Sequence, residues 1–384
     1  MATNQRSGAR SAVALALLLI LALFLVSLAP QAAHGSSPSA IPGGLVYLRA
    51  GDADAFTRVP PPPEAAGPHD VEINVTYDGF TPEAEEAFQY AVDIWAAQLT
   101  SDVPIEVVAS WEPLEPGVLG AAGPVTFVRD WEVGDPPPMD ETWYAVALAN
   151  KLADEDLCPP DGTDCDLDHD IEALFNSDFD DWYFGVDGET PPGQYDFVSV
   201  VLHELGHGLG FSGSATVEGN LGSWGLGSGF PFIYDVFVEN GDGEQLIDTK
   251  IFPNPSEELA DQLQGGDLYF AGPAATAANG GEPPEIFAPF LWLQGSSYSH
   301  LDEDAFPAGD PDSLMTPYLD TAEAIHNPGD ITRGIFDDEG WTVDPTAVTL
   351  DGISATPLSP NVSAFAALGA LVVLAGVVVL RRKR

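Results

Sequence analysis

One segment of this 384-residue chain constrains the fold more than any other, because it places two histidines on one face of a patterned helix. His203 and His207 are four residues apart, and residues with that spacing lie one above the other on a helix. The other side of the same segment carries apolar residues suited to a core: Val198, Leu202, Leu205 and Leu209. The segment therefore predicts a helix of about residues 195–209 that packs on a core and presents two imidazoles.

Glu204 follows His203 directly, which puts a carboxylate beside a metal ion held by the two imidazoles but outside its ligand shell. Zinc binds neutral imidazoles and lowers the pKa of its bound water to about 7. A nearby glutamate can accept the proton of that water, so His-Glu-x-x-His on a helix indicates hydrolysis by metal-activated water. The alternative is a pair of surface histidines one helical turn apart.

A catalytic zinc ion usually takes three ligands from the protein, so a third must come from elsewhere in the chain. The chain has seven histidines, and five of them lie outside the helix. His34 lies beside the N-terminal apolar run, His69 precedes the first expected strand, and His169 lies in an acidic loop. This leaves His300 and His326 as alternatives.

The order of these motifs resembles the leishmanolysin-like branch of the metzincin zinc peptidases. In most metzincins the pattern is His-Glu-x-x-His-x-x-Gly-x-x-His, but here the last position is Gly213, which has no side chain. In the leishmanolysin-like branch the helix continues into Gly-Phe-Ser, and an insertion separates the second histidine from the third. The third histidine is followed by a methionine turn and a closing helix. This chain has Gly210-Phe211-Ser212, then His300, then Met315.

The resemblance covers about residues 195–213 and 296–341. It implies that His203, His207 and His300 are zinc ligands and that Glu204 is the general base. Two further residues take structural roles: Met315 supports the site from below without binding the metal, and Gly210 turns the chain at the end of the helix. Zinc would be a single catalytic ion.

The expected fold class is α+β, with a metzincin-like catalytic domain in which a mixed sheet is backed by the active-site helix. Alternating residues 71–77 predict a strand, and Thr81-Pro82 predicts the start of a helix. Further strands are expected at 105–111, 125–131 and 171–175, the last as an edge strand that pairs with an extended substrate. A long insertion precedes the third zinc ligand.

The expected division of the chain follows composition. It runs as a signal peptide 1–35, a linker or short propeptide 36–68, an N-terminal catalytic subdomain 69–213, an insertion 214–297, a C-terminal catalytic subdomain 298–341, a stalk 342–362, a transmembrane or sorting helix 363–380 and a basic tail 381–384. These ends predict an extracellular body on the cell surface, a membrane partner through the C-terminal helix, and a C-terminus inside the cell.

Charge narrows the range of partners. The chain has 60 acidic and 12 basic residues, for a formal net charge of −48. Phosphate contacts need Lys and Arg, so this composition argues against a nucleic-acid partner.

Export also favours a disulfide between Cys158 and Cys165. The alternating acids of residues 164–170 leave a calcium site possible, but they do not match the EF-hand pattern, and a solvated acidic loop explains them better.

The sequence therefore predicts an exported zinc endopeptidase that acts on protein or peptide substrates. The alternative is a surface adhesion or binding protein on a metallopeptidase scaffold that has lost catalysis. Glu204 argues against that alternative, because a structural zinc site does not require this carboxylate.

Overall fold

The computed structural model describes residues 38–63, 71–160, 165 and 167–343. The chain divides into two units, 1–347 and 348–384, and every element described below belongs to the first. The predicted signal peptide, stalk, C-terminal helix and basic tail lie outside the described residues, apart from residues 342 and 343.

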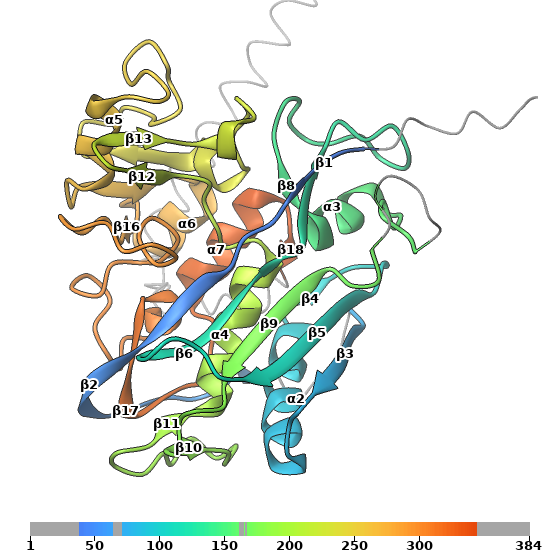
Figure 1. The fold of residues 1–384 in the computed structure, drawn as a ribbon, viewed down its shortest axis with the longest axis vertical. Coiled ribbons are helices and arrows are strands. Elements are labelled where there is room, and N and C mark those ends of the chain that lie inside the picture. The colour runs from blue at the N-terminus through green and yellow to red at the C-terminus, as the bar shows by residue number, and fades with distance from the viewer. Residues whose placement is uncertain (1–37, 64–70, 161–164, 166, 344–384) are drawn as a thin grey trace, which may run out of the picture. The chain divides into compact units, whose positions relative to one another are not determined.

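A six-stranded mixed sheet organises this unit (Figure 1). Its order is β17 (Tyr318–Ile325), β2 (Val46–Val59), β6 (Val118–Pro124), β9 (Ile171–Asn176), β5 (Ile105–Glu112) and β3 (Ile73–Asp78). Strand β6 runs antiparallel to both of its neighbours, whereas the pairs β17/β2, β9/β5 and β5/β3 are parallel. Every residue of β6 is buried, which fits a central strand covered on both faces.

The predicted α+β class is wrong, because the structure is a mixed α/β arrangement with several sheets. Strand β3 continues through helix α2 (Pro82–Ala96) into its parallel neighbour β5. Two parallel neighbours in a sheet must be joined by a crossover such as this helix, whereas antiparallel neighbours can be joined by a short turn. Strand β9 is also not the predicted edge strand, since it lies between β5 and β6.

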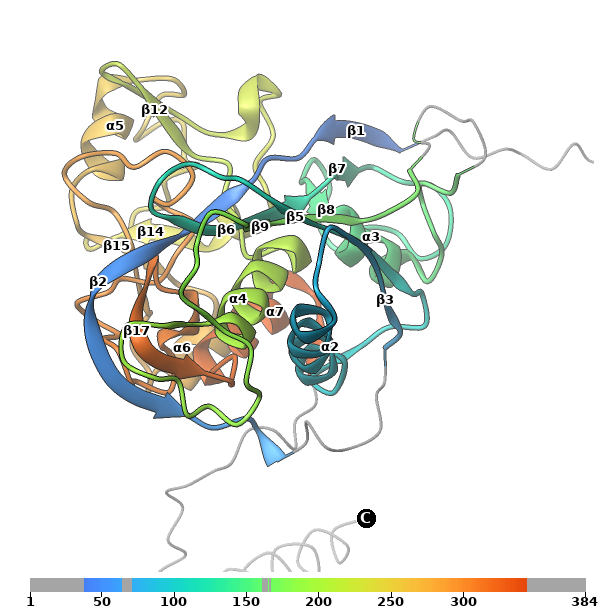
Figure 2. The same ribbon diagram turned by 60° about the horizontal axis from the view of Figure 1, so that its bottom comes forward.

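Helices α2, α4 (Phe197–Leu209) and α7 (Asp330–Glu339) lie on one side of the central sheet (Figure 2). Helix α2 begins as its sequence predicts: the Thr81 hydroxyl accepts a hydrogen bond from the Ala84 amide, and Pro82 occupies the first turn. Its buried face packs on α4, and the Trp95 indole N–H donates to the carbonyl of Leu202 at 2.9 Å. This pairing holds α4 beside α2 on the same side of the sheet (Figure 2).

No helix within the described ranges is both long enough and apolar enough to cross a bilayer. The predicted C-terminal transmembrane helix, residues 363–380, lies outside the described residues.

The segment interpreted as a linker or short propeptide contains β1 (Ser39–Pro42) and the 14-residue strand β2. Strand β1 joins a small sheet with β7 (Thr126–Arg129) and β8 (Tyr144–Ala145). Strand β2 completes the central sheet between β6 and β17. The sequence did not predict β2, because the flanks of this strand are rich in proline and glycine and its hydrogen-bond partners lie far away in the sequence.

The region 214–297, the predicted insertion, forms its own small layer of hairpins and helices (Figure 1). Its elements are β12 (Thr216–Glu218), β13 (Leu221–Ser223), η2 (Gly225–Gly227), η3 (Tyr234–Phe237), β14 (Val238–Asn240), α5 (Glu257–Leu263), β15 (Leu268–Phe270), α6 (Pro273–Ala278) and β16 (Glu285–Ile286). Helix α6 packs against α7, with Gly334 lying close to Ala275.

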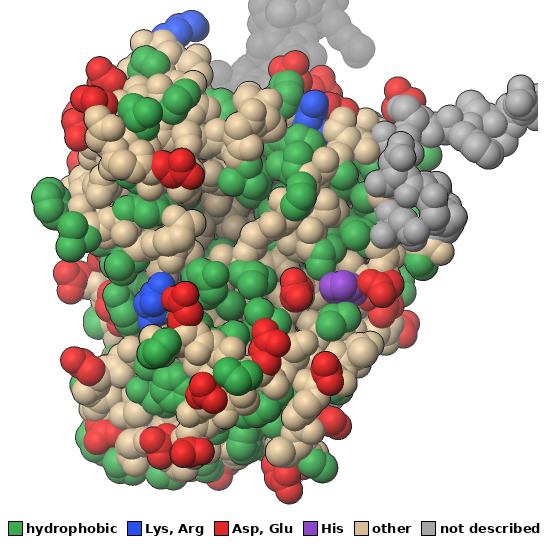
Figure 3. Space-filling model, in the orientation of Figure 1, with side chains coloured by type: hydrophobic (Ala, Val, Ile, Leu, Met, Phe, Trp, Pro, Cys, Tyr) green, Lys and Arg blue, Asp and Glu red, His purple; other side chains and the backbone are tan. Residues whose placement is uncertain are grey.

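The remaining elements are short. They are β4 (Leu99–Thr100), paired with β18 (Thr342–Val343); α3 (Val146–Ala153); β10 (Trp182–Tyr183), paired with β11 (Tyr195–Asp196); and the 3₁₀ turn η4 (Ser313–Met315). Acidic side chains are scattered over the face shown in Figure 3, where basic ones are few.

Candidate metal centre

Helix α4 is capped at both ends, by an aspartate side chain at its start and by a glycine at its end. At its start, the Asp196 carboxylate accepts hydrogen bonds from the amide and the hydroxyl of Ser199, at 2.8 and 2.7 Å. At its end, Gly210 has φ 130°, a backbone conformation that side chains disfavour, and its N–H reaches back to the carbonyls of Gly206 and His207. All thirteen residues of α4 are buried.

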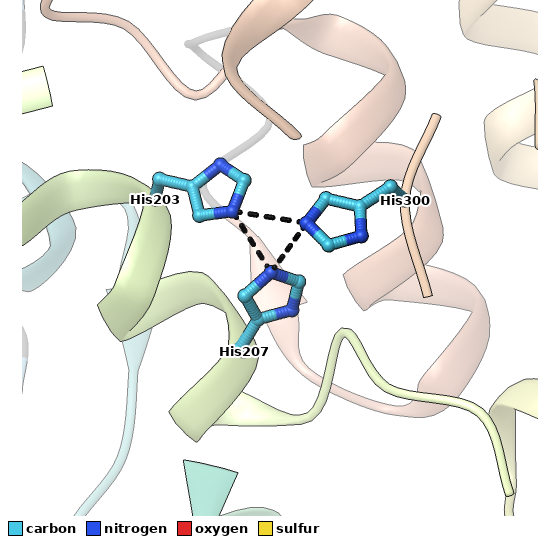
Figure 4. A group of neighbouring side chains, drawn as sticks. All are labelled: His203, His207 and His300. Carbon is cyan, nitrogen blue, oxygen red and sulfur yellow. Dashed lines mark hydrogen bonds between the residues drawn. The ribbon is translucent and has the colours of Figure 1, made fainter. Parts of the chain in front are cut away.

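Three imidazoles converge in the core beside this helix (Figure 4). Each one uses its Nδ1 on a backbone carbonyl: His203 on Leu314 at 2.6 Å, His207 on Phe211 at 2.7 Å, and His300 on Ser296 at 2.6 Å. A carbonyl oxygen only accepts, so each Nδ1 carries the proton. The three Nε2 atoms therefore present lone pairs toward one point.

The separations between these nitrogens fit a shared metal ion. The Nε2 atoms lie 2.9, 3.2 and 3.2 Å apart. Nitrogens bound to a tetrahedral zinc ion at about 2.0–2.1 Å lie about 3.3–3.4 Å from one another, which is close to this spacing. Three neutral acceptors this close repel one another unless a cation lies among them. The donor set therefore fits a metal ion.

Burial keeps these imidazoles in the neutral form that binds metals. It lowers the pKa of His203 to about 4, and the pKa values of His207 and His300 fall well below the usual value. Burial is the largest cause in each case, and the neighbouring imidazoles lower the pKa of His207 and His300 further.

Glu204 points from α4 toward the sheet and is completely buried. Its Oε1 accepts a hydrogen bond from the Leu48 amide at 3.3 Å, while its Oε2 has no partner. Burial raises the pKa of Glu204 well above its usual value. A buried carboxylate oxygen without a partner, on the residue that follows His203, is unusual in a folded protein and makes Glu204 a candidate functional residue.

The room for this carboxylate comes from a glycine in the neighbouring strand. A Cβ on Gly120 of β6 would lie 2.8 Å from Oε1 and 2.9 Å from Cγ of Glu204. No other residue type leaves that space free. Gly120 and the backbone of Leu48 and Ala122 are contacts of Glu204 that sequence reasoning missed, because none of them belongs to a recognisable motif.

The loop that delivers His300 is clamped on both sides. The His300 carbonyl accepts from the Phe287 amide at 2.8 Å, and the next amide, Leu301, donates to the Met315 carbonyl at 2.8 Å. Met315 itself lies fully buried in η4, and a Cβ on Gly206 of α4 would come within 2.9 Å of its sulfur. Met315 therefore packs beneath the helix that carries the histidines.

His326 belongs to a different part of the core. Its Nε2 lies 2.9 Å from Asp196, the residue that caps the start of α4. His326, the alternative third ligand, is therefore a structural partner of the residue that caps α4. His169 pairs with the exposed Asp168, and His34 and His69 lie outside the described residues.

Cys158 and Cys165 form a disulfide. The acidic run that allowed a calcium site is only partly described, because Asp164 and Asp166 fall outside the described ranges. Asp170 is buried and accepts hydrogen bonds from the Glu106 amide and the Asn150 side chain. Among the described residues, the three histidines are the one group of three or more His, Cys, Asp or Glu residues close enough to share a metal.

The metal centre is closed to solvent. His203 is 1 % exposed, and His207, His300 and Glu204 are 0 % exposed. A surface hollow of about 640 Å³ lies elsewhere, between β3 and α2, where Val71, Gln89 and Asp102 line it. It shares no residue with the metal centre. Access to the histidines therefore requires part of the chain to move.

Comparison with known proteins gives one partial match. A family described as SPBPB7E8-like matches residues 164–221, a span that includes α4 and both of its histidines. This is well under half of the chain. No curated protein matches the chain.

Proposed function

We propose that this chain is an exported zinc-dependent endopeptidase of the metzincin type, most similar to the leishmanolysin-like branch. The observation that carries the proposal is the convergence of three Nε2 lone pairs, together with the buried carboxylate of Glu204, which follows His203 on α4 and has one oxygen without a partner. A metal centre that only stabilises the fold has no use for such a carboxylate. The choice of zinc rests on the three neutral imidazoles, which suit zinc among the common divalent ions.

The histidines, the glutamate and the methionine take separate roles in this proposal. His203, His207 and His300 would hold the ion, and a zinc ion held in this way activates water and polarises a carbonyl. Glu204 would accept the proton of the attacking water and return it to the leaving amine nitrogen of the peptide. Met315, beneath the helix, would keep the ligands in place without touching the metal.

The alternative is a binding protein on the same scaffold, with a metal ion but no hydrolysis. The feature that favours it is the closed site, since a peptidase must admit its substrate. The feature that opposes it is Glu204, which follows His203 on α4 and is buried with one oxygen unpartnered. A buried carboxylate with an unpartnered oxygen destabilises the folded protein, and proteins tolerate such groups mainly at functional sites.

The test compares the chain with Glu204→Gln, and uses Glu323→Gln as a control. Glu323 is another buried glutamate, and its carboxylate accepts from the Asp320 amide, away from the histidines. Each protein is loaded with zinc, and the bound metal is measured by mass spectrometry. Cleavage of casein is then followed for the intact chain and for a chain cut by an added protease after Pro63, because the intact site is closed.

We expect zinc in all three proteins and casein cleavage that only Glu204→Gln abolishes. Zinc binding without cleavage in either the intact or the cut form would contradict the peptidase and support the binding protein. Failure to bind zinc would contradict the site itself.

A further inference from the structure

His300 reaches the metal centre from a segment other than the helix that carries His203 and His207 (Figure 4). This segment lies far along the chain, and closing a loop over such a distance costs conformational entropy. Contacts between the two segments must therefore hold the loop in place. One set of these contacts passes through a buried carboxylate of the insertion, Asp235 in η3.

Asp235 is 0 % exposed and accepts hydrogen bonds from three segments of the chain. The Ser214 amide donates to its Oδ1 at 2.9 Å, and the Ser214 hydroxyl donates to its Oδ2. The Phe232 amide donates to Oδ2 at 2.8 Å. The Tyr298 hydroxyl also donates to this carboxylate. All four groups are donors, so an ionised carboxylate, which only accepts, satisfies every one of them.

Ser214 follows the end of the helix that carries the first two histidines. The Phe211 carbonyl, three residues before Ser214, accepts the hydrogen bond from Nδ1 of His207. A Cβ on the intervening Gly213 would lie 3.1 Å from Oδ1 of Asp235, so the carboxylate packs directly against this turn. Asp235 therefore fixes the chain just beyond the carbonyl that orients His207.

Tyr298 stands two residues before His300 and has a backbone that few tyrosines adopt. Its φ is 74°, in the left-handed region, and such a conformation persists only where the surrounding structure holds it. The Tyr298 amide donates to the Phe287 carbonyl at 2.7 Å, and its hydroxyl donates to Asp235. Hydrogen bonds to an ionised carboxylate are roughly twice as strong as those between neutral groups. The side chain of Tyr298 is therefore held by the stronger of its two contacts.

We propose that Asp235 is a positioning residue of the metal centre, which fixes His300 through Tyr298 and thereby raises the affinity for the metal ion. This inference rests on the zinc site of the proposed function, and it does not depend on hydrolysis. Without the carboxylate, the left-handed backbone at Tyr298 loses its strongest contact, and the imidazole of His300 moves away from the other two.

The test uses the full chain and measures the metal rather than cleavage. Asp235→Asn keeps the shape of the side chain but replaces one accepting oxygen with an amide donor. Tyr298→Phe removes only the hydroxyl, and its result decides the question if Asp235→Asn does not fold. Asp170→Asn is the matched control, because Asp170 is another buried aspartate that accepts from a backbone amide and from a side chain, neither of which belongs to the metal centre.

Zinc affinity is measured by competition with a chelating dye, and Co²⁺ bound in place of zinc reports the ligand geometry through its visible absorption. We expect zinc affinity to fall about tenfold in Asp235→Asn and in Tyr298→Phe, because groups that orient metal ligands typically contribute about 10- to 100-fold. The cobalt spectrum should change in both variants, since a displaced imidazole alters the coordination geometry. Asp170→Asn should melt at a lower temperature but keep the zinc affinity and the cobalt spectrum of the unaltered chain.

Two outcomes would overturn the inference while leaving the metal site in place. Lower melting temperatures in Asp235→Asn and Tyr298→Phe, with zinc affinity and cobalt spectrum unchanged, would make Asp235 a structural residue only. An equal loss of affinity in Asp170→Asn would show that any loss of stability weakens zinc binding.

The outcomes also separate this inference from the proposed function. Failure of the unaltered chain to bind zinc would overturn both. A tenfold loss of zinc affinity in the two variants of a chain that never cleaves casein would support the role of Asp235 and contradict only the peptidase.

Discussion

Replacing Gly120 with alanine should lower the activity through a single added methyl group. The added Cβ would lie 2.8 Å from Oε1, 2.9 Å from Cγ and 3.1 Å from Cδ of Glu204, all closer than ordinary van der Waals contact. Both groups are buried, so either the carboxylate moves by a few tenths of an ångström or strand β6 does. Overpacking of this size typically destabilises a core by about 1–3 kcal/mol. A displaced base lowers the rate, since a misplacement of about 1 Å can cost about 100-fold.

We therefore expect Gly120→Ala to lower kcat for casein cleavage by about 10- to 100-fold, with bound zinc and KM nearly unchanged. The melting temperature should fall by about 2–4 °C for each kcal/mol lost. Gly44→Ala is the control, because Gly44 is exposed and no atom lies within 4 Å of its added Cβ. Full activity in Gly120→Ala, in a form that retains zinc, would refute the argument that this glycine positions the base.

Three further predictions concern the metal ligands, the metal and pH. His300→Ala should lose zinc, whereas His326→Ala should keep it and melt at a lower temperature, because His326 pairs with Asp196; bound metal and melting curves distinguish the two. Chelation of zinc should lower the melting temperature of the unaltered chain, and added zinc should restore it, since the ion binds only the folded state. Burial, and then the neighbouring carboxylate of Glu303, raise the pKa of Glu323 to about 7, so its folded-state pKa exceeds the unfolded value and stability is lost as pH rises toward 7. Glu323→Gln should therefore stabilise the chain at pH 8 by up to about 3 kcal/mol and much less at pH 5, as measured by urea unfolding at both pH values; equal gains would contradict this.

The parts of the site that the sequence predicted are those encoded locally. The spacing of His203 and His207 within α4 follows from helical geometry alone, and Gly210 ends that helix where the sequence placed the turn. Thr81 and Pro82 likewise begin α2. The identity of His300 as the third residue in the cluster required the resemblance, since nothing in its own neighbourhood distinguished it from His326.

The parts that were missed depend on pairings between distant segments. Strand β2 pairs with β6 and with β17, which lies roughly 270 residues further along the chain in its register. The exposed middle of β2 contains Asp52 and Asp54 and is typical of a polar linker, because β2 buries few side chains. A strand held mainly by backbone hydrogen bonds shows little alternation of apolar and polar residues in the sequence.

Gly213 shows how the loss of a local ligand and the gain of a distant one are linked. In the uninterrupted metzincin pattern this position carries the third histidine, and here a Cβ would lie 2.1 Å from the ring of Tyr298. Tyr298 is buried, adopts a φ of 74°, and stands two residues before His300. The Gly213 amide also donates to Ser299 at 3.1 Å. The loop that brings His300 to the metal centre thus occupies the space that a side chain at position 213 would need. The two ligand positions exclude one another sterically, so the glycine is a condition for His300 to reach the site.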